Sequence, residues 1–429
     1  MSLNAAGPAP TALKSRLSAM MFLQYAIWGA WLPFLWSFLS DHRHMSDSQI
    51  GMLFAAGAIG ALLGPFIAGQ VADRHFATEK FLGISHLIGA ALIWQLSEVE
   101  SFHAFLRFSL IYGLVYSPTL ALTNSLAFHH LPDRDRDFGA VRLWGTFGWI
   151  VVGIAMGHWL AYAHTPADAT AEVVHAAQVA GKADAFRLSA VLGALMGVYC
   201  FFLPHTPPSK TGRNNATLEA LRAVKRQPLL TLFLLAVPVS CIHQFYFVHT
   251  EGFLHAKLQV PESFRTIFGV GGGGFMTIGQ MVEVLVLGLI PLVAKKVTRR
   301  TLLAVGLIAY ALRMALFAYA QDSGMWLLVG VGLHGICFGC FIFVAFMIVD
   351  EETSSDVRAS AQSLFNLVII GIGIIVGSSI AGSVATWAKG SGAMDYERLF
   401  SVPMYASIVC LALLLAFYPK STRRVATGN

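Results

Sequence analysis

The sequence predicts an all-α integral membrane protein in which twelve transmembrane helices form two six-helix bundles. Three observations carry this prediction. The 429 residues are 56% hydrophobic and only 12% charged, with a mean hydropathy of +0.65, and a soluble core of this length does not need so much apolar surface. Twelve stretches are long and apolar enough to cross a ~30 Å hydrocarbon core. One polar segment separates the first six stretches from the last six.

The predicted spans follow one another with mostly short connections. They cover, to within several residues, 17–40, 50–70, 80–98, 102–128, 141–163, 186–204, 228–249, 266–293, 301–320, 324–349, 359–385 and 398–418. The first apolar run is too long for the core of a signal peptide and lacks a convincing small-residue cleavage site, so we expect it to be retained as a span.

The longest polar interruption divides the chain. We predict an amino-terminal six-helix bundle (1–204), a cytoplasmic linker (205–227) and a carboxy-terminal six-helix bundle (228–429). Within the linker, "TLEALRAVKR" is expected to form a short amphipathic helix on the inner membrane surface. The alanine-rich segment 164–185 is expected to be an outer loop without chemistry.

The basic residues predict the orientation in the membrane. With the amino terminus in the cytoplasm, 20 of the 29 Lys and Arg residues fall on the inner side, as the positive-inside rule requires. We therefore expect a multi-pass protein of the cytoplasmic (inner) membrane with both termini in the cytoplasm. The net charge of +6 reports this topology. Nucleic-acid binding is not expected, because no soluble domain gathers basic residues on one face.

Patterns typical of enzymes or metal sites are incomplete. Cys337 and Cys340 have redox or metal spacing, but they lie in a predicted span without a second ligand pair, so we interpret all five cysteines as small buried apolar residues. "GVGGGGFM" (269–276) lacks the Lys-Ser/Thr of a phosphate loop and follows no strand; in a span it permits close helix approach. No enzyme activity, cofactor or metal is expected.

The stretch "GQMVEVLVLGLIP" (279–291) places a carboxylate near the middle of an otherwise apolar span. A charge there costs roughly 3 kcal/mol or more, so such side chains face a bundle interior or a wet cavity. Gln280 lies three residues before Glu283 and therefore on the same helical face. Two interpretations stay open: a structural carboxylate paired with another helix, for example through Arg313, or a group that handles substrate or protons.

Other polar positions within spans are individually weaker. Arg142 opens span five, and Thr146 and Trp149 follow it on the same face, so this stripe either lines a cavity or anchors and packs the span. The remaining positions are His243, Gln244, Phe247 and His249 in span seven, His334 and Phe338 in span ten, Asn124 in span four, and Gln24 with Trp28 in span one.

Six plus six spans around a basic central loop resemble the layout of the major facilitator superfamily. "GQVADR", between spans two and three, resembles the superfamily's G-x-x-x-D-[RK] loop motif, here Gly69, Asp73 and Arg74. A glycine allows helices to cross closely, and the charge pair can engage a neighbouring helix end. The resemblance implies the major facilitator fold, with two pseudo-symmetric six-helix bundles and a substrate cavity at their midplane interface, open alternately to each side.

Longer stretches resemble the bacterial nucleoside–proton symporter family, the nucleoside and xanthosine permeases, across nearly the whole chain. They are "FLQYAIWGAWL", "SPTLALTN", "VRLWGTFGW", "GQMVE", "ALRMALFAYA" and "RASAQSLFN". The resemblance implies proton-coupled uptake of nucleosides by alternating access, with Glu283 as the proton-coupling group. It places the substrate-binding positions on Arg142, Thr146, Trp149, Gln244, Phe247, Gln280, Glu283, His334 and Phe338. Trp149 stands where the nucleoside permease has Phe.

Three departures from the family pattern concern the second half. Phe247 stands where the nucleoside permease has Asn, His334 where it has Tyr, and Gly339 where it has a functionally important Asp. The lost amide and carboxylate make this half more apolar and leave Glu283 as the more isolated coupling group, so a modified nucleoside or another small polar solute would also fit.

Two alternatives to nucleoside uptake follow. One is a facilitator for a sugar or other small polar metabolite, and the other is a non-translocating membrane sensor, against which the lack of a soluble output domain speaks. The expected partners are the solute, protons and the lipid bilayer, and we expect the protein to act as a monomer.

Overall fold

The computed structural model describes residues 10–67, 76–207, 222–294, 296–354, 361–362 and 364–420. These residues form helices joined by turns and short connections, and no strand occurs among them. The predicted loop motif of Gly69, Asp73 and Arg74 lies outside the described residues, as does half of the predicted linker helix, residues 217–221.

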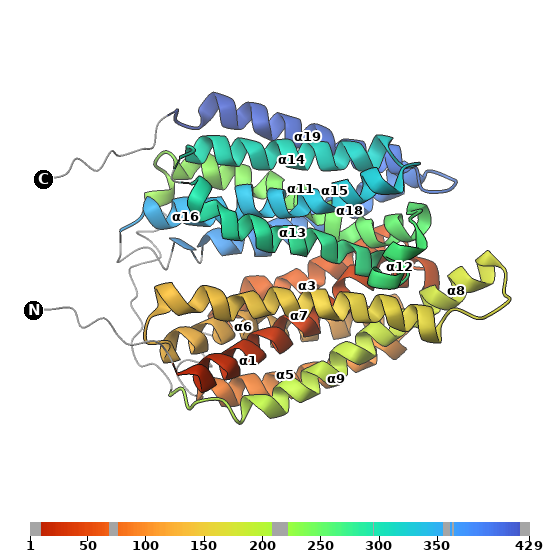
Figure 1. Cartoon of the computed structure of the whole chain (residues 1–429), viewed down its shortest axis with the longest axis horizontal. Coiled ribbons are helices and arrows are strands. Elements are labelled where there is room, and N and C mark those ends of the chain that lie inside the picture. The colour runs from red at the N-terminus through yellow and green to blue at the C-terminus, as the bar shows by residue number, and fades with distance from the viewer. Residues whose placement is uncertain are drawn as a thin grey trace, which may run out of the picture. The chain divides into compact units, whose positions relative to one another are not determined.

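The chain forms two compact units (Figure 1). The first contains Met1–Thr211 and Pro261–Thr277, and the second contains Gly212–Val260 and Ile278–Asn429. Helices of the first unit are α1 (Thr11–Trp31), α2 (Leu35–Ser37), α3 (Asp47–Ile67), α5 (Thr78–Glu98), α6 (Phe102–His130), α7 (Arg134–Ala163), α8 (Ala171–Gly181), α9 (Ala183–Cys200) and α12 (Glu262–Phe268). A 3-10 turn (η1, Leu32–Phe34) and a π-helical turn (η2, Phe38–His42) flank α2.

The second unit carries the helices drawn from green to blue in Figure 1, except α12 and the beginning of α13. They are α11 (Leu229–Lys257), α14 (Arg299–Tyr319), α15 (Gly324–Cys337), α16 (Val344–Glu351), α18 (Gly373–Lys389) and α19 (Tyr396–Phe417), with π-helical segments η4 (Phe338–Phe343) and η5 (Leu367–Ile372). α13 (Gly272–Val293) begins in the first unit and continues in the second. The sequence-based division at 205–227 stays a prediction.

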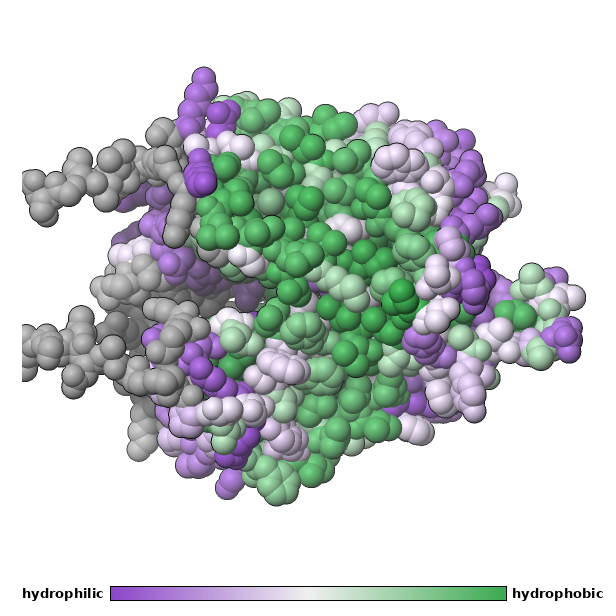
Figure 2. Space-filling view, viewed as in Figure 1, coloured by the Kyte–Doolittle hydropathy of each residue, from purple (hydrophilic) through white to green (hydrophobic). Residues whose placement is uncertain are grey.

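The long helices have the length and surface of membrane spans. Within the described residues, ten helices are long and apolar enough to cross a membrane, and α1 and α3, of 21 residues each, lie where the first two spans are predicted. Large apolar side chains stay exposed on them, for example Leu285 at 65%, which suits lipid and not water. Figure 2 shows apolar side chains over the middle of the helices in each unit and hydrophilic ones towards their ends.

The glycine-rich segment that precedes α13 packs against α7, as expected for close helix approach. Gly269 has a φ of +74°, a conformation that side chains with a Cβ rarely adopt. A Cβ at Gly269 would overlap the backbone of Gly157 in α7, and Val270 N donates a hydrogen bond of 3.0 Å to Gly157 O. This segment is therefore a packing element of the first unit.

The segment 164–185 differs from the loop that the sequence predicts. It contains α8, whose first turn is capped by Thr170, since the Thr170 hydroxyl accepts from Val173 N. Alanine has the highest intrinsic helix propensity, so the alanine-rich composition favours a helix once a cap is present. The loop expected from the sequence therefore contains a helix that was not predicted.

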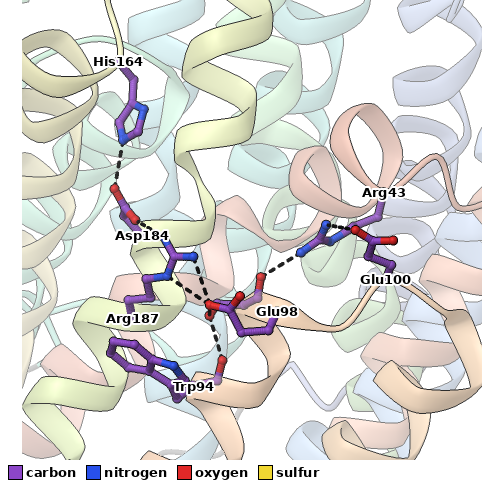
Figure 3. Close-up of polar contacts among 8 residues, drawn as sticks. Arg43, Trp94, Glu98, Glu100, His164, Asp184 and Arg187 are labelled. Carbon is purple, nitrogen blue, oxygen red and sulfur yellow. Dashed lines mark hydrogen bonds and ion pairs between the residues drawn. The ribbon is translucent and has the colours of Figure 1, made fainter.

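The same segment also contributes to a polar network at the start of α9 (Figure 3). Asp184 accepts hydrogen bonds of 2.8 Å each from His164 Nε2 and Arg187 Nη1. Trp159 Nε1 of α7 also donates to Asp184 at 2.8 Å. Arg187 Nη2 also donates to Glu98 Oε1, 2.9 Å away at the end of α5. Asp184 thus joins the ends of α7 and α9, and Arg187 joins α9 to α5.

Arg43, directly after η2, extends these contacts to the beginning of the chain. Its Nη2 donates to the backbone carbonyl of Ser97 at 2.7 Å, and its Nη1 lies 3.7 Å from Glu100 Oε1. Four segments of the first unit are therefore held together at this end by charged and polar side chains.

We predict that Asp184→Ala destabilises the first unit, because three donors lose one acceptor. The donors are partly exposed and regain water, so the expected loss is only about 1 kcal/mol of unfolding free energy. The measurement is the unfolding transition of the purified protein in detergent. Asp322→Ala, at an exposed turn, is the control, and equal transitions for both variants would show that the network contributes nothing.

Candidate functional site

Glu283 lies in the part of α13 that belongs to the second unit. The helix reads "GGGFMTIGQMVEVLVLGLIPLV" and Glu283 is its only charged residue. Glu283 Oε2 lies 3.6 Å from His334 Nε2 of α15, and the Glu283 side chain keeps 13% exposure while that of His334 keeps 2%. The carboxylate is therefore largely buried and lies beside His334.

A close crossing of α13 and α15 makes this contact. A Cβ on Gly335 would lie 2.8 Å from Glu283 Cα and would overlap the backbone of Val282 and Glu283. On the other helix, a Cβ on Gly279 would lie 2.9 Å from His334 Cβ. Glycine on each helix thus lets the backbones touch and places His334 beside the carboxylate.

Aromatic side chains of α11 enclose His334. Its ring stacks on Tyr246 at 4.5 Å and on His243 at 5.2 Å between ring centroids, and Phe247 meets it edge-on at 5.7 Å. Phe338 lies 6.5 Å from His243. The structure therefore brings together three of the predicted substrate-binding residues, Phe247, His334 and Phe338.

Arg313 of α14 lies behind His334. It is fully buried, and its Nη1 donates to His334 Nδ1 at 3.2 Å. The guanidinium carbon lies 4.6 Å from the ring centroid of Tyr246 and 5.0 Å from that of Tyr310, which is cation–π geometry. His334 therefore contacts Arg313 through one ring nitrogen and Glu283 through the other.

The two predicted glutamines have different surroundings. Gln244 of α11 donates through Nε2 to Ser378 Oγ of α18 at 3.3 Å, so this amide takes part in helix packing. Gln280 is buried, yet its Oε1 accepts no hydrogen bond from any described residue. Gln280 shares a helical face with Glu283, and its binding role stays a prediction.

α15 ends at Cys337, and the helix continues from Phe338 as the π-helical segment η4. Such segments recur at functional sites. Gly339 lies in η4, and a Cβ on it would lie 2.5 Å from Val286 Cγ1 of α13. An acidic side chain has no room at position 339 unless Val286 moves. Val286 therefore fills the space that a carboxylate at this position would need.

In the first unit, the predicted stripe on α7 packs against α1. The Arg142 guanidinium carbon lies 3.9 Å from the ring centroid of Tyr25, and Trp149 meets Trp28 edge-on at 5.7 Å. Arg142, Thr146 and Trp149 all remain partly exposed. The stripe is therefore both packed and accessible, and its binding role stays a prediction.

A buried polar network around Gln24 was not predicted as a whole. Gln24 Nε2 donates to Thr119 Oγ1 at 2.9 Å, and Gln24 Oε1 accepts from His86 Nε2 at 3.0 Å. The backbone carbonyl of Gln24 accepts from Tyr116 OH at 2.6 Å. His86 and Thr119 were missed, although a histidine within an apolar span is a usable signal. Tyr246 and Tyr310 of the second unit were missed because tyrosines in spans are ordinary packing residues.

Apolar helices that enclose charged and aromatic clusters are typical of a membrane transporter of the major facilitator type. The chain belongs to the nucleoside H+ symporter family, whose sequence profile matches residues 11–423. The family resemblance inferred from the sequence is confirmed.

Relatives and a solved structure agree with this assignment. YegT of Escherichia coli (strain K12) is 32% identical over 380 residues, which cover 86% of this chain and 83% of YegT. The nucleoside permease NupG of the same organism is 27% identical over 436 residues, covering 97% and 98%. The crystal structure of nucleoside transporter NupG superposes with a TM-score of 0.80 at 25% identity and covers 94% of this chain and 98% of that chain. The all-α membrane fold and the expectation of a transporter, not an enzyme, are thereby confirmed.

We predict that Gly335→Ala removes transport, because the added Cβ must push α13 away from α15 and separate Glu283 from His334. Overpacking of this kind costs about 1–3 kcal/mol. Solute uptake and the unfolding transition are the measurements. Gly288→Ala, also on α13 and with no atom within 4 Å of the new Cβ, is the matched control. Wild-type uptake by Gly335→Ala would contradict the close crossing.

Proposed function

We propose that this protein carries nucleosides into the cell together with protons, by alternating access. The observation that supports this most is the Glu283 carboxylate, 3.6 Å from His334 and enclosed by apolar helices, in a member of the nucleoside H+ symporter family. A carboxyl group that exchanges a proton inside the membrane is the physical requirement for a proton-coupled carrier. Glu283 is the proposed proton-coupling group.

The surrounding side chains suit the two chemical parts of a nucleoside. Gln280 and Glu283 can hydrogen-bond ribose hydroxyls, and the rings of Phe247 and Phe338 offer apolar faces to a base. His334 and Gln244 complete the proposed contacts of the second unit. In the first unit we assign Arg142, Thr146 and Trp149 to substrate binding.

We further propose that the protein lies in the cytoplasmic (inner) membrane with both termini in the cytoplasm. The excess of Lys and Arg on the predicted inner segments supports this orientation. We expect a single chain to be the transporting unit, since it contains both units with their proposed binding residues.

A second candidate function follows from Gly339. Val286 occupies the space that an acidic side chain at this position would need, so the site offers fewer polar groups than the family pattern implies. A facilitator for a sugar or another small polar metabolite fits this feature. Counterflow in liposomes with a panel of labelled nucleosides and sugars, with and without a proton gradient, separates the two functions.

We predict that Glu283→Gln abolishes proton-driven accumulation of nucleoside, because an amide cannot take up and release the proton. Uptake driven by an imposed pH gradient in vesicles is the measurement, with expression confirmed by immunoblot. Glu262→Gln, on the exposed surface of α12, is the matched control and should accumulate solute normally. Full, pH-dependent uptake by Glu283→Gln would exclude the coupling role.

We predict that Arg142→Ala raises the KM for uptake about tenfold, the effect of losing one charged hydrogen bond. Arg142→Lys should give an intermediate value, because an ammonium keeps the charge but loses the planar contact with Tyr25. Arg107→Ala, at an exposed position of α6, is the control. An unchanged KM in Arg142→Ala would reassign Arg142 to membrane topology.

A further inference from the structure

The proposed transport mechanism assigns no direct role to the charged side chain of Arg313. Arg313 is fully buried within α14, "RRTLLAVGLIAYALRMALFAY", and the residues next to it in sequence, Leu312 and Met314, are apolar. A buried guanidinium is costly unless it is paired and hydrogen-bonded. Its position therefore needs an explanation beyond packing.

The contacts of Arg313 are directional. The faces of the guanidinium meet the rings of Tyr246 and Tyr310, and its one hydrogen bond to a described residue goes from Nη1 to His334 Nδ1 at 3.2 Å. Neither Nε nor Nη2 has a hydrogen-bond partner among the described residues. The strongest polar interaction of Arg313 is thus made with one atom of His334.

This contact determines where His334 carries its proton. Arginine has only donors, so Nδ1 of His334 must act as the acceptor and is unprotonated. A neutral imidazole then has its single proton on Nε2, which is the nitrogen 3.6 Å from Glu283 Oε2. The separation is slightly longer than a hydrogen bond, and a shift of a few tenths of an ångström closes it.

The rings around His334 hold it in this orientation. Tyr246 and His243 stack on it with interplanar angles of 21° and 27°, and Phe247 meets it at 89°. A ring flip that turned Nδ1 away from Arg313 and Nε2 away from Glu283 would have to displace these side chains. The orientation of His334 is therefore maintained by packing, and its tautomer by Arg313.

We propose that Arg313 is a positioning residue that holds His334 as the neutral Nε2–H tautomer, directs that donor towards Glu283, and prevents His334 from taking up a second proton. Protonation of Nδ1 would place an N–H against the Arg313 donor, so an incoming proton goes to Glu283. The inference deepens the proposed function and rests on the coupling role of Glu283.

Several titratable or charged groups surround His334. They are Glu283 on α13, Arg313 and Tyr310 on α14, His243 and Tyr246 on α11, and Cys337 on α15. Of these, only Arg313 makes a hydrogen bond with His334 Nδ1 among the contacts of described residues, and His243 Nδ1 is hydrogen-bonded to Tyr310 OH at 2.7 Å.

The test is nitrogen NMR of the full-length protein, labelled with ¹⁵N-histidine and reconstituted in lipid, without solute or a gradient. The His334 signals are those that vanish in His334→Gln. We expect an unprotonated Nδ1 and a protonated Nε2 that persist when the pH is lowered from 7.5 to about 5.5, a range in which free histidine charges. A proton on Nδ1, or a doubly protonated ring at pH 7.5, overturns the proposal.

Variants separate the tautomer effect from folding. Arg313→Met removes the donor, so His334 should become a mixture of tautomers and take up a second proton on acidification, and proton-driven uptake should fall about tenfold or more. Arg313→Lys supplies a donor and should restore the wild-type spectrum and much of the uptake. A wild-type His334 spectrum in folded Arg313→Met overturns the proposal; if that variant does not fold, the wild-type and Arg313→Lys spectra decide.

Arg398→Met is the matched control, because Arg398 is exposed on α19 and its side chain pairs with Asp395. Its His334 spectrum and uptake should equal those of the wild type. The spectrum needs no transport, so a wrong tautomer refutes the role of Arg313, whereas unchanged pH-dependent uptake by Glu283→Gln refutes the proposed coupling.

Discussion

An ionisable side chain within an apolar helix must find its partner inside the protein, because lipid supplies none. The second unit meets this constraint with one chain of contacts from α14 through α15 to α13. Arg313 donates to one nitrogen of His334, and the other nitrogen faces Glu283. The arrangement of the surrounding aromatic rings, and the proposed path of a proton, both depend on these contacts.

Close helix approach makes such a chain possible. Hydrophobic burial drives little association between helices in lipid, so packing and interhelical hydrogen bonds must do so. Gly335 and Gly279 let α13 and α15 touch at the level of the carboxylate, and Gly157 and Gly269 do the same for α7 and the segment before α13. Small residues therefore place polar side chains with the precision that proton exchange and solute binding require.

Apolar packing also shapes the proposed site. Val286 packs against Gly339, where the family pattern implied an acid, and Phe247 supplies a ring where that pattern implied an amide. The aromatic cluster is consequently larger and the polar set smaller than the family pattern implies. Gln280, whose buried oxygen accepts no hydrogen bond from a described residue, becomes the principal neutral polar group beside Glu283.

The sequence by itself determined the membrane class, the places of the long helices and the family, because hydropathy and short residue motifs are local properties. It also singled out Glu283 as a carboxylate in an apolar run, and the coupling role of this residue stays a prediction. The loop expected at 164–185 contains a helix that was not predicted, since capping and alanine propensity favour one there. Only the tertiary structure placed His334 between Arg313 and Glu283 and bonded Gln244 to Ser378. These pairs come from helices distant in sequence, and no local pattern records which faces meet.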